Sequence, residues 1–171
     1  MSYKLVKPSM GMKQEYLSYI TEWEDSGERI VPYASRRNES DFESLLSKWE
    51  VDSSEKAYEN GFVPSTIFFM VDESGKVFGA LHIRHELNEE LLLHGGHIGY
   101  GVRPSERRKG IATKMLSIAL PIAKELGINK ALVTCDKNNH ASARTIIVNG
   151  GTLENEVPEE DRITQRYWIE L

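Results

Sequence analysis

The spacing of apolar side chains predicts two helices near the start of the chain. Within Met12–Trp23 an apolar side chain recurs every three or four residues, which is the period of a helix, and the cluster Asp25–Gly27 ends the pattern. The same spacing returns within Asp41–Trp49. A short strand over residues 3–7, ended by Pro8, is expected before both helices.

The pattern then changes to that of strands. Residues 65–72 and 77–85 are rich in β-branched and aromatic side chains and are separated by a polar turn, which predicts an antiparallel hairpin. One or two helical turns are expected over residues 86–94. A glycine-bearing strand over residues 96–103 follows, and it ends at Pro104 because proline cannot continue a strand ladder.

The strongest helical pattern covers residues 111–126, where a broad apolar stripe predicts packing across a sheet. Pro121 lies inside this helix and should kink it or cost it a hydrogen bond, and Gly127 is placed to end it. A right-handed βαβ crossover is the default for a helix that leads to a buried strand. The remaining elements complete a single α+β domain over residues 1–171: a strand at 131–134, a helix at about 139–149, and strands near 151–157 and 162–171.

Composition excludes several classes of protein. The apolar fraction of 40% and the charged fraction of 27% are those of ordinary globular domains, so wholesale disorder is not expected. No apolar run approaches a membrane span, and the N-terminus lacks the apolar segment of a signal peptide, so we expect a cytoplasmic protein with no membrane partner. The one cysteine, Cys135, cannot form an intrachain disulfide. A metal site built from it with Asp136 and His140 is not expected, because too few soft ligands cluster there.

Charge argues against a nucleic-acid partner. The formal net charge is −5 with both signs interleaved, whereas a protein that grips duplex DNA normally shows a basic stripe. The one dense basic cluster, Arg103 with Arg107–Lys109, is short. It suits a small polyanion better than a polymer.

This cluster lies in the segment Gly99–Ala112, which joins a predicted strand to the strongest helix. Free backbone N–H groups and the positive dipole end make a helix start a binding place for phosphate, and Gly110 lets the loop approach a ligand or adopt positive φ. Two familiar phosphate-binding loops do not fit. Lys109 precedes Gly110, whereas a P-loop needs lysine after glycine, and Pro104 stands where a dinucleotide fingerprint needs its third glycine.

The six residues Arg107–Ala112 match the acetyl-CoA signature Arg/Gln-x-x-Gly-x-Gly/Ala, between a strand ending in Gly-Val-Arg-Pro and a long helix. Downstream, Asn139–Ser142 and Asn149–Gly151 are similar to the Asn-x-x-Ser…Gly pattern of the same family. The chain thus resembles the GNAT superfamily of N-acetyltransferases over residues 65–157. The resemblance implies an α+β fold (an α/β sandwich) with a mixed, mostly antiparallel central sheet, helices on both faces, and a cleft where the fourth and fifth strands part.

The resemblance also implies which residues bind acetyl-CoA as acyl donor. Backbone groups of Tyr100, Gly101 and Val102 would meet the pantetheine arm, and Asn139 and Ser142 would lie near the arm or the nucleotide end. The turn formed by residues 108–112 is called the cradle. Its backbone N–H groups would hold the pyrophosphate, and Arg107 or Arg108 would add positive charge. The residues of the cradle are Arg108, Lys109, Gly110, Ile111 and Ala112.

The reaction implied is direct attack of an amine on the thioester in a ternary complex, which needs a base and an acid. His97 and Glu86 are the candidate bases, since histidine titrates near neutral pH and a carboxylate can act through water. His82 and His85 are weaker candidates.

The acid is less clear, because Ile146 stands where many members of the superfamily carry a tyrosine. Tyr100, Ser142 and Cys135 are the possible substitutes. The alternative to an enzyme is a non-catalytic acyl-CoA-binding module, and a phosphate-loop nucleotide hydrolase is disfavoured by the failed loop match.

The acceptor is a small-molecule or peptide amine of unknown identity. In the superfamily its pocket is shaped by segments that correspond to residues 10–60 and 86–96 here, and these carry no recognisable motif. A homodimer is the expectation from the family.

Overall fold

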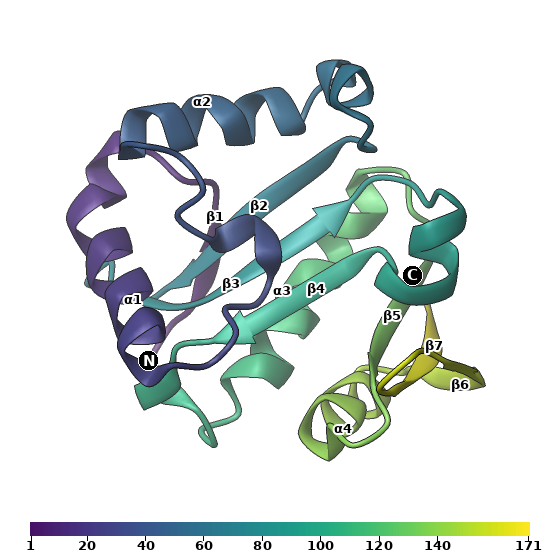
Figure 1. Cartoon of the computed structure of the whole chain (residues 1–171). Coiled ribbons are helices and arrows are strands. Elements are labelled where there is room, and N and C mark those ends of the chain that lie inside the picture. Colours follow the sequence, from purple (N-terminus) through teal and green to yellow (C-terminus); the bar gives the residue numbers. More distant parts are fainter.

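Two antiparallel sheets form the framework of the computed structural model, which describes residues 1–171 (Figure 1). The larger sheet has the order β1-β2-β3-β4 and the smaller one β5-β7-β6. The strands are β1 (Lys4–Val6), β2 (Ser65–Val71), β3 (Val77–Arg84), β4 (Ile98–Val102), β5 (Lys130–Asp136), β6 (Thr152–Pro158) and β7 (Ile163–Glu170).

Four α-helices cover the sheets on opposite faces, and the fold class predicted from the sequence is confirmed. The helices are α1 (Lys13–Ser26), α2 (Phe42–Asp52), α3 (Ile111–Glu125) and α4 (His140–Val148). Every predicted helix and strand is present, with ends shifted by a few residues. The helical turns expected over residues 86–94 form the π-helical turn η4 (Leu91–Gly95).

Strand β2 shows how the two layers of helices are held. It is buried along its whole length because its side chains alternate between two cores. Ile67 and Phe69 belong to the core under α1 and α2, which is rich in aromatic side chains, whereas Phe68 and Met70 belong to the core under α3. A strand covered on both faces therefore reads as a continuous apolar run.

Pro121 does not interrupt helix α3, which runs through it to Glu125. The residue is exposed, so the carbonyl that loses its N–H partner faces solvent and water can replace the bond. The hydrogen bond that proline removes is therefore lost on the exposed side of the helix and not in the core.

The larger and smaller sheets meet only where β4 approaches β5. There His97 N–H donates to the carbonyl of Leu132 over 2.7 Å, and Leu132 N–H donates to His97 Nδ1 over 2.9 Å. Beyond this pair no ladder joins the two strands, and they part. The cleft expected between the fourth and fifth strands is therefore present.

Two glycines of β4 face the loop that follows α1, and they differ in the room they leave. A Cβ on Gly101 would lie 1.9 Å from the carbonyl oxygen of Val31, whereas a Cβ on Gly99 would lie 3.7 Å from Pro32 Cβ. We expect Gly101→Ala to lower the free energy of unfolding by about 1–3 kcal/mol, because overpacking moves backbone. Gly99→Ala should cost much less. Urea unfolding of both variants checks this, and equal losses would contradict the packing of the loop on Gly101.

Candidate functional site

A cavity of about 560 Å³ opens between β4, the start of α3 and the start of α4. The end of α1 and the loop after it form the opposite wall. Most of the residues predicted to bind a cofactor line this cavity: Tyr100, Gly101, Val102, Arg107, Arg108, Gly110, Ile111, Ala112, Asn139 and Ser142. Lys109 is the one predicted residue that does not line the cavity.

The floor of the cavity at the start of α3 is a run of free backbone donors. The N–H groups of residues 108–113 have no acceptor within the protein, and no side chain caps the helix at Gly110. Arg108 and Gly110 both adopt left-handed φ, of 62° and 76°, which aims successive N–H groups at one point. This donor set fits a pyrophosphate, which needs several donors and the positive end of a helix.

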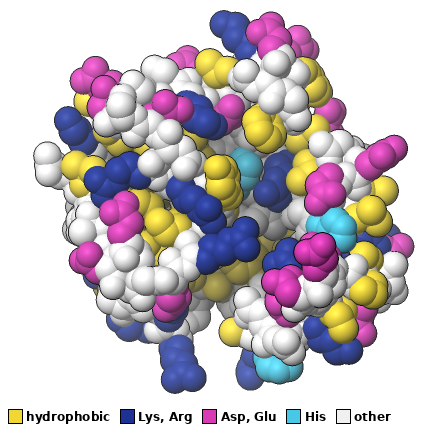
Figure 2. Space-filling model, viewed as in Figure 1, with side chains coloured by type: hydrophobic (Ala, Val, Ile, Leu, Met, Phe, Trp, Pro, Cys, Tyr) yellow, Lys and Arg dark blue, Asp and Glu magenta, His cyan; other side chains and the backbone are white.

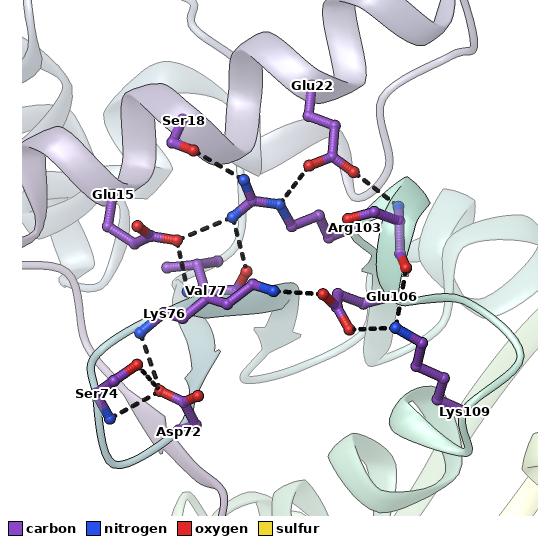
Figure 3. Close-up of polar contacts among 11 residues, drawn as sticks. Glu15, Ser18, Glu22, Asp72, Ser74, Lys76, Val77, Arg103, Glu106 and Lys109 are labelled. Carbon is purple, nitrogen blue, oxygen red and sulfur yellow. Dashed lines mark hydrogen bonds and ion pairs between the residues drawn. The ribbon is translucent and has the colours of Figure 1, made fainter.

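Two of the predicted cationic side chains point away from the cradle (Figure 3). Arg103 is buried and turns toward α1, where its guanidinium donates to Glu22 over 2.6 Å and to Glu15 over 2.9 Å. Lys109 pairs with Glu106 over 2.9 Å. These two charges pair with carboxylates and do not line the cavity, so that Arg107 and Arg108 are the members of the basic cluster that do.

Arg107 lines the cavity, but its charge is already compensated. Its guanidinium lies 2.8 Å from a carboxylate oxygen of Glu28 and stacks 4.8 Å from the ring centre of Trp23. Arg108 is exposed at the cradle and forms no ion pair. Arg108 is therefore the side chain that can add charge to the free N–H groups.

No strand pairs with the edge of β4 that faces the cleft, where the Val102 carbonyl accepts only a 3.4 Å bond from Arg107 Nε. Hydrogen bonds from Arg103 N–H to Phe78 and from Arg84 N–H to His97 fix the alternation of the antiparallel ladder. Backbone groups of Tyr100 and Val102 consequently face the cleft. Those of Gly101 face β3, which corrects the prediction that all three residues offer backbone groups to one ligand.

Tyr100 bridges the cleft with its side chain. Its hydroxyl lies 2.8 Å from Ser142 Oγ, and Ser142 N–H donates to the Asn139 side chain, which caps α4. Burial raises the pKa of Tyr100 to about 12, so the phenol is protonated at neutral pH. Burial likewise raises the pKa of the nearby Cys135 thiol to about 11. The hydroxyl groups of Tyr100 on β4 and Ser142 on α4 are therefore both neutral where they meet beside the cavity.

His97 does not line the cavity, and its geometry does not support the prediction that it acts as the base. Burial, and then the charge of Arg84, lower the pKa of His97 to about 4, so the ring is neutral. Its Nδ1 lone pair accepts from Leu132 N–H, which leaves the ring proton on Nε2. A ring in that tautomer has no lone pair free to take a proton.

Glu86, the other predicted base, also lies outside the cavity and accepts a 2.6 Å hydrogen bond from the Tyr58 hydroxyl. His85 is bonded to Thr66 over 2.8 Å, and burial lowers the pKa of His82 to about 3. Of the three residues predicted to be catalytic, Tyr100 alone lines the cavity.

Ile146, at the position where the superfamily often has tyrosine, is buried in the core that packs around α3. Helix α4 turns this position away from the cavity and presents Thr145 instead. Sequence reasoning missed Thr145 and the wall residues Glu28, Arg29 and Val31, because the loop after α1 has no periodic pattern.

Free N–H groups at a helix start, beside a strand edge exposed by parting sheets, define a protein that binds an acyl-coenzyme A. The model of the acetyltransferase (GNAT) family matches residues 17–146, well over half of the chain. The chain therefore belongs to the GNAT acetyltransferase family, whose reaction is transfer of an acetyl group from acetyl-CoA.

Solved structures share the fold at low sequence identity. A spermidine N-acetyltransferase chimera from Vibrio cholerae is 15% identical, with a TM-score of 0.67 over 99% of this chain and 96% of that one. A putative acetyltransferase from Salmonella typhimurium, solved with acetyl-CoA, is 14% identical, with a TM-score of 0.66 over 100% and 95%. A putative phosphinothricin N-acetyltransferase is 15% identical, with a TM-score of 0.63 over 99% of each chain.

No curated protein sequence matches the chain. No helix of the structure combines the length and the apolar character needed to cross a membrane. No group of three or more His, Cys, Asp or Glu side chains is arranged to hold a metal ion.

Proposed function

We propose that the protein is an N-acetyltransferase in which an amine attacks the acetyl thioester directly while both substrates are bound. The observation that carries this proposal is the run of free N–H groups at residues 108–113, which lies beside the unpaired edge of β4. In this proposal acetyl-CoA is the acyl donor substrate. Its thioester supplies the activated acetyl group.

Each part of the donor has matching protein groups. The N–H groups of residues 108–113, with the exposed Arg108, would hold the pyrophosphate. Backbone groups of Tyr100 and Val102 would pair with the amides of the pantetheine arm, as a further strand would. Asn139 and Ser142 lie across the cleft from them and would contact the same arm.

Tyr100 is the group best placed to assist the leaving sulfur. A phenol with a pKa of about 12 stays protonated at neutral pH, so it can donate a hydrogen bond, and with it the proton, to a developing thiolate. In this step the nitrogen–carbon bond forms, the carbon–sulfur bond breaks, and the sulfur takes the phenol proton. Ser142 then returns a proton to Tyr100 from solvent.

No free base lines the cavity. Its two glutamates, Glu28 and Glu106, are both ion-paired, with Arg107 and with Lys109 respectively. The amine would therefore react in its neutral form and release its proton through water.

Tyr100→Phe should lower kcat about 100-fold, because general acid assistance of this kind contributes about that much. Acetyl-CoA affinity, measured by calorimetric titration, should stay within a few-fold. Tyr167→Phe is the matched control, because Tyr167 is a buried tyrosine outside the cavity whose hydroxyl bonds to Gln165. A wild-type kcat in Tyr100→Phe would remove Tyr100 from the mechanism.

The proposed reaction is tested with purified protein, acetyl-CoA and a broad panel of amines. Release of free CoA and the mass gain of the acceptor are measured together. Acetylation of at least one amine is the expected result. Binding of acetyl-CoA without acetylation of any amine would favour a non-catalytic acyl-CoA-binding module.

A cytoplasmic location and a homodimer are further parts of the proposal. The net charge of −5 and the absence of a basic stripe support a small or peptide amine as partner instead of a nucleic acid. Cell fractionation and sedimentation equilibrium test the two points directly.

A further inference from the structure

A polar hollow lies on the face of the larger sheet that carries α1 and α2. Ile67 and Ala80 point into the core under these helices, so His82 and Arg84, two and four residues after Ala80 along β3, lie on the same face. Figure 2 shows Lys and Arg side chains around a recess near the middle of this face of the molecule. The helices do not cover this end of the sheet (Figure 1).

Arg84 is largely buried there and has no carboxylate partner. One terminal nitrogen of its guanidinium donates to the carbonyls of Gly95 and Gly96, over 3.0 and 3.2 Å. Its Nε and its other terminal nitrogen bond to no protein group. Burial lowers the pKa of Arg84, as expected of a cation without an anion.

The other buried arginines of the protein are compensated. Arg103 has two carboxylates within 3 Å, Glu15 and Glu22, and Arg166 is paired with Glu154. A buried guanidinium left unpaired is costly unless a partner arrives. Arg84 is thus the one position where the fold keeps a buried positive charge available.

The positive charge of the hollow comes from Arg84 itself. Lys48, which lies nearby, is paired with Asp52 over 2.6 Å, and burial lowers the pKa of His82 to about 3, so that its ring is neutral. The uncompensated guanidinium is therefore the group that attracts an anion.

The hollow adjoins the place of reaction. Gly99, which pairs with His82 in the sheet, precedes Tyr100, whose backbone faces the cleft. A Cβ on Gly99 would lie 3.7 Å from Pro32 Cβ and 4.0 Å from a terminal nitrogen of Arg84. A molecule that touches Arg84 therefore lies within a few ångströms of the middle of β4.

We propose that the acceptor is an amine that also carries a carboxylate, as an amino acid does, and that Arg84 binds this carboxylate. This inference rests on the proposed N-acetyltransferase reaction. The two unbonded guanidinium nitrogens match a carboxylate in a two-point pairing. The uncompensated guanidinium of Arg84 disfavours polyamines as acceptors.

The test uses acceptor pairs with and without the carboxylate, phenylalanine against phenylalanine amide and glutamate against its diamide, compared at equal concentrations of the neutral amine because amidation also lowers the pKa of the amine. With the wild-type protein the free carboxylates should react with a kcat/KM on the order of 100-fold higher, the value of one charge-assisted pair. Arg84→Gln should abolish this preference by raising KM for the carboxylates alone. Arg84→Lys should retain part of it.

Glutamine keeps an N–H donor for the carbonyl of Gly95, so we expect Arg84→Gln to fold. An unchanged acetyl-CoA affinity, measured by calorimetry, would verify that this variant is folded. Gly99→Ala adds a methyl group beside Arg84 and should raise acceptor KM without changing acetyl-CoA affinity. A wild-type preference for the amides, or a carboxylate preference that survives in Arg84→Gln, would overturn the inference. Both outcomes leave the acetyltransferase reaction standing, whereas acetylation of no amine at all would remove that reaction first.

Discussion

Gly110→Val is expected to abolish measurable acetyl-CoA binding, whereas Gly127→Val, at the opposite end of the same helix, is expected to leave it unchanged. Both glycines have positive φ, 76° and 93°, and neither has a heavy atom within 4 Å of an added Cβ. A β-branched residue is strained by such a backbone at either position. At Gly110, a change of backbone conformation that relieves the strain also reorients the N–H groups of the cradle. At Gly127 the same change leaves those N–H groups in place.

The comparison separates strain from function. Urea unfolding should show similar losses for the two variants, on the order of 1–2 kcal/mol. Calorimetric titration with acetyl-CoA, with ATP and NADH as control ligands, should show at least a 100-fold weaker affinity for Gly110→Val alone. If both variants bind like the wild type, the pyrophosphate is not held by the N–H groups of residues 108–113.

Arg103→Met should lower the free energy of unfolding by about 3 kcal/mol, because it leaves two carboxylates without their shared cation. The Arg103 side chain is 10% exposed, and Glu15 and Glu22 are 32% and 28% exposed, so water compensates only in part. Figure 3 shows how the guanidinium joins α1 to the segment before the cradle. The loss is read from urea unfolding at pH 7.

The control for Arg103→Met is the same substitution at Arg162, whose ion pair with Glu159 is 42% and 24% exposed. An exposed pair of this kind contributes at most about 1 kcal/mol. A triple variant that also carries Glu15→Gln and Glu22→Gln should regain most of the lost stability, because no charge is left unpaired. If Arg103→Met costs no more than Arg162→Met, the buried pairs do not stabilise the loop.

The Arg103 cluster also predicts a dependence on pH. Burial alone would raise the pKa of Glu22, but hydrogen bonds from Arg103 and Ser105 outweigh it and hold the pKa below its usual range. Its contribution to stability is therefore present above the pKa of the unfolded chain, and it is lost as the pH falls through the lower pKa of the folded state. Arg103→Met should show a weaker loss of stability as the pH falls through that range.

Local patterns in the sequence predicted the elements well, and they grouped residues that line one cavity in the structure. Alternation and helical spacing are set by neighbours along the chain, and the signature Arg107–Ala112 is itself local, so both can be recognised without tertiary contacts. The partners of Arg103 could not be found in this way. They lie on α1, more than 80 residues away, and which carboxylates a cation meets is decided by packing.

The same limit explains the errors in the catalytic residues. His97 looks like a base in a sequence, because the bond that occupies its Nδ1 comes from Leu132 on another strand. Gly101 and Tyr100 are adjacent, yet only the ladder to β3 decides which of them offers its backbone to the cleft. Arg84 belongs to no sequence motif. Its proposed role in binding a carboxylate is inferred from the lack of a carboxylate partner within the protein, which only the structure reveals.

The two sheets are anchored to each other at one end of the cleft. The His97–Leu132 pair is reinforced there by bonds from Thr134 to the carbonyl of His94 and from Arg166 to the carbonyl of Leu92. Beyond this anchor the Tyr100–Ser142 hydrogen bond is a side-chain link across the cleft, and no ladder has to break when the strands part further. The core beneath is continuous, since α3 packs with Leu81 of one sheet and Val133 of the other. The volume of apolar side chains under α3 therefore helps to set the angle between the sheets, so that a core substitution far from any ligand can change the width of the cleft.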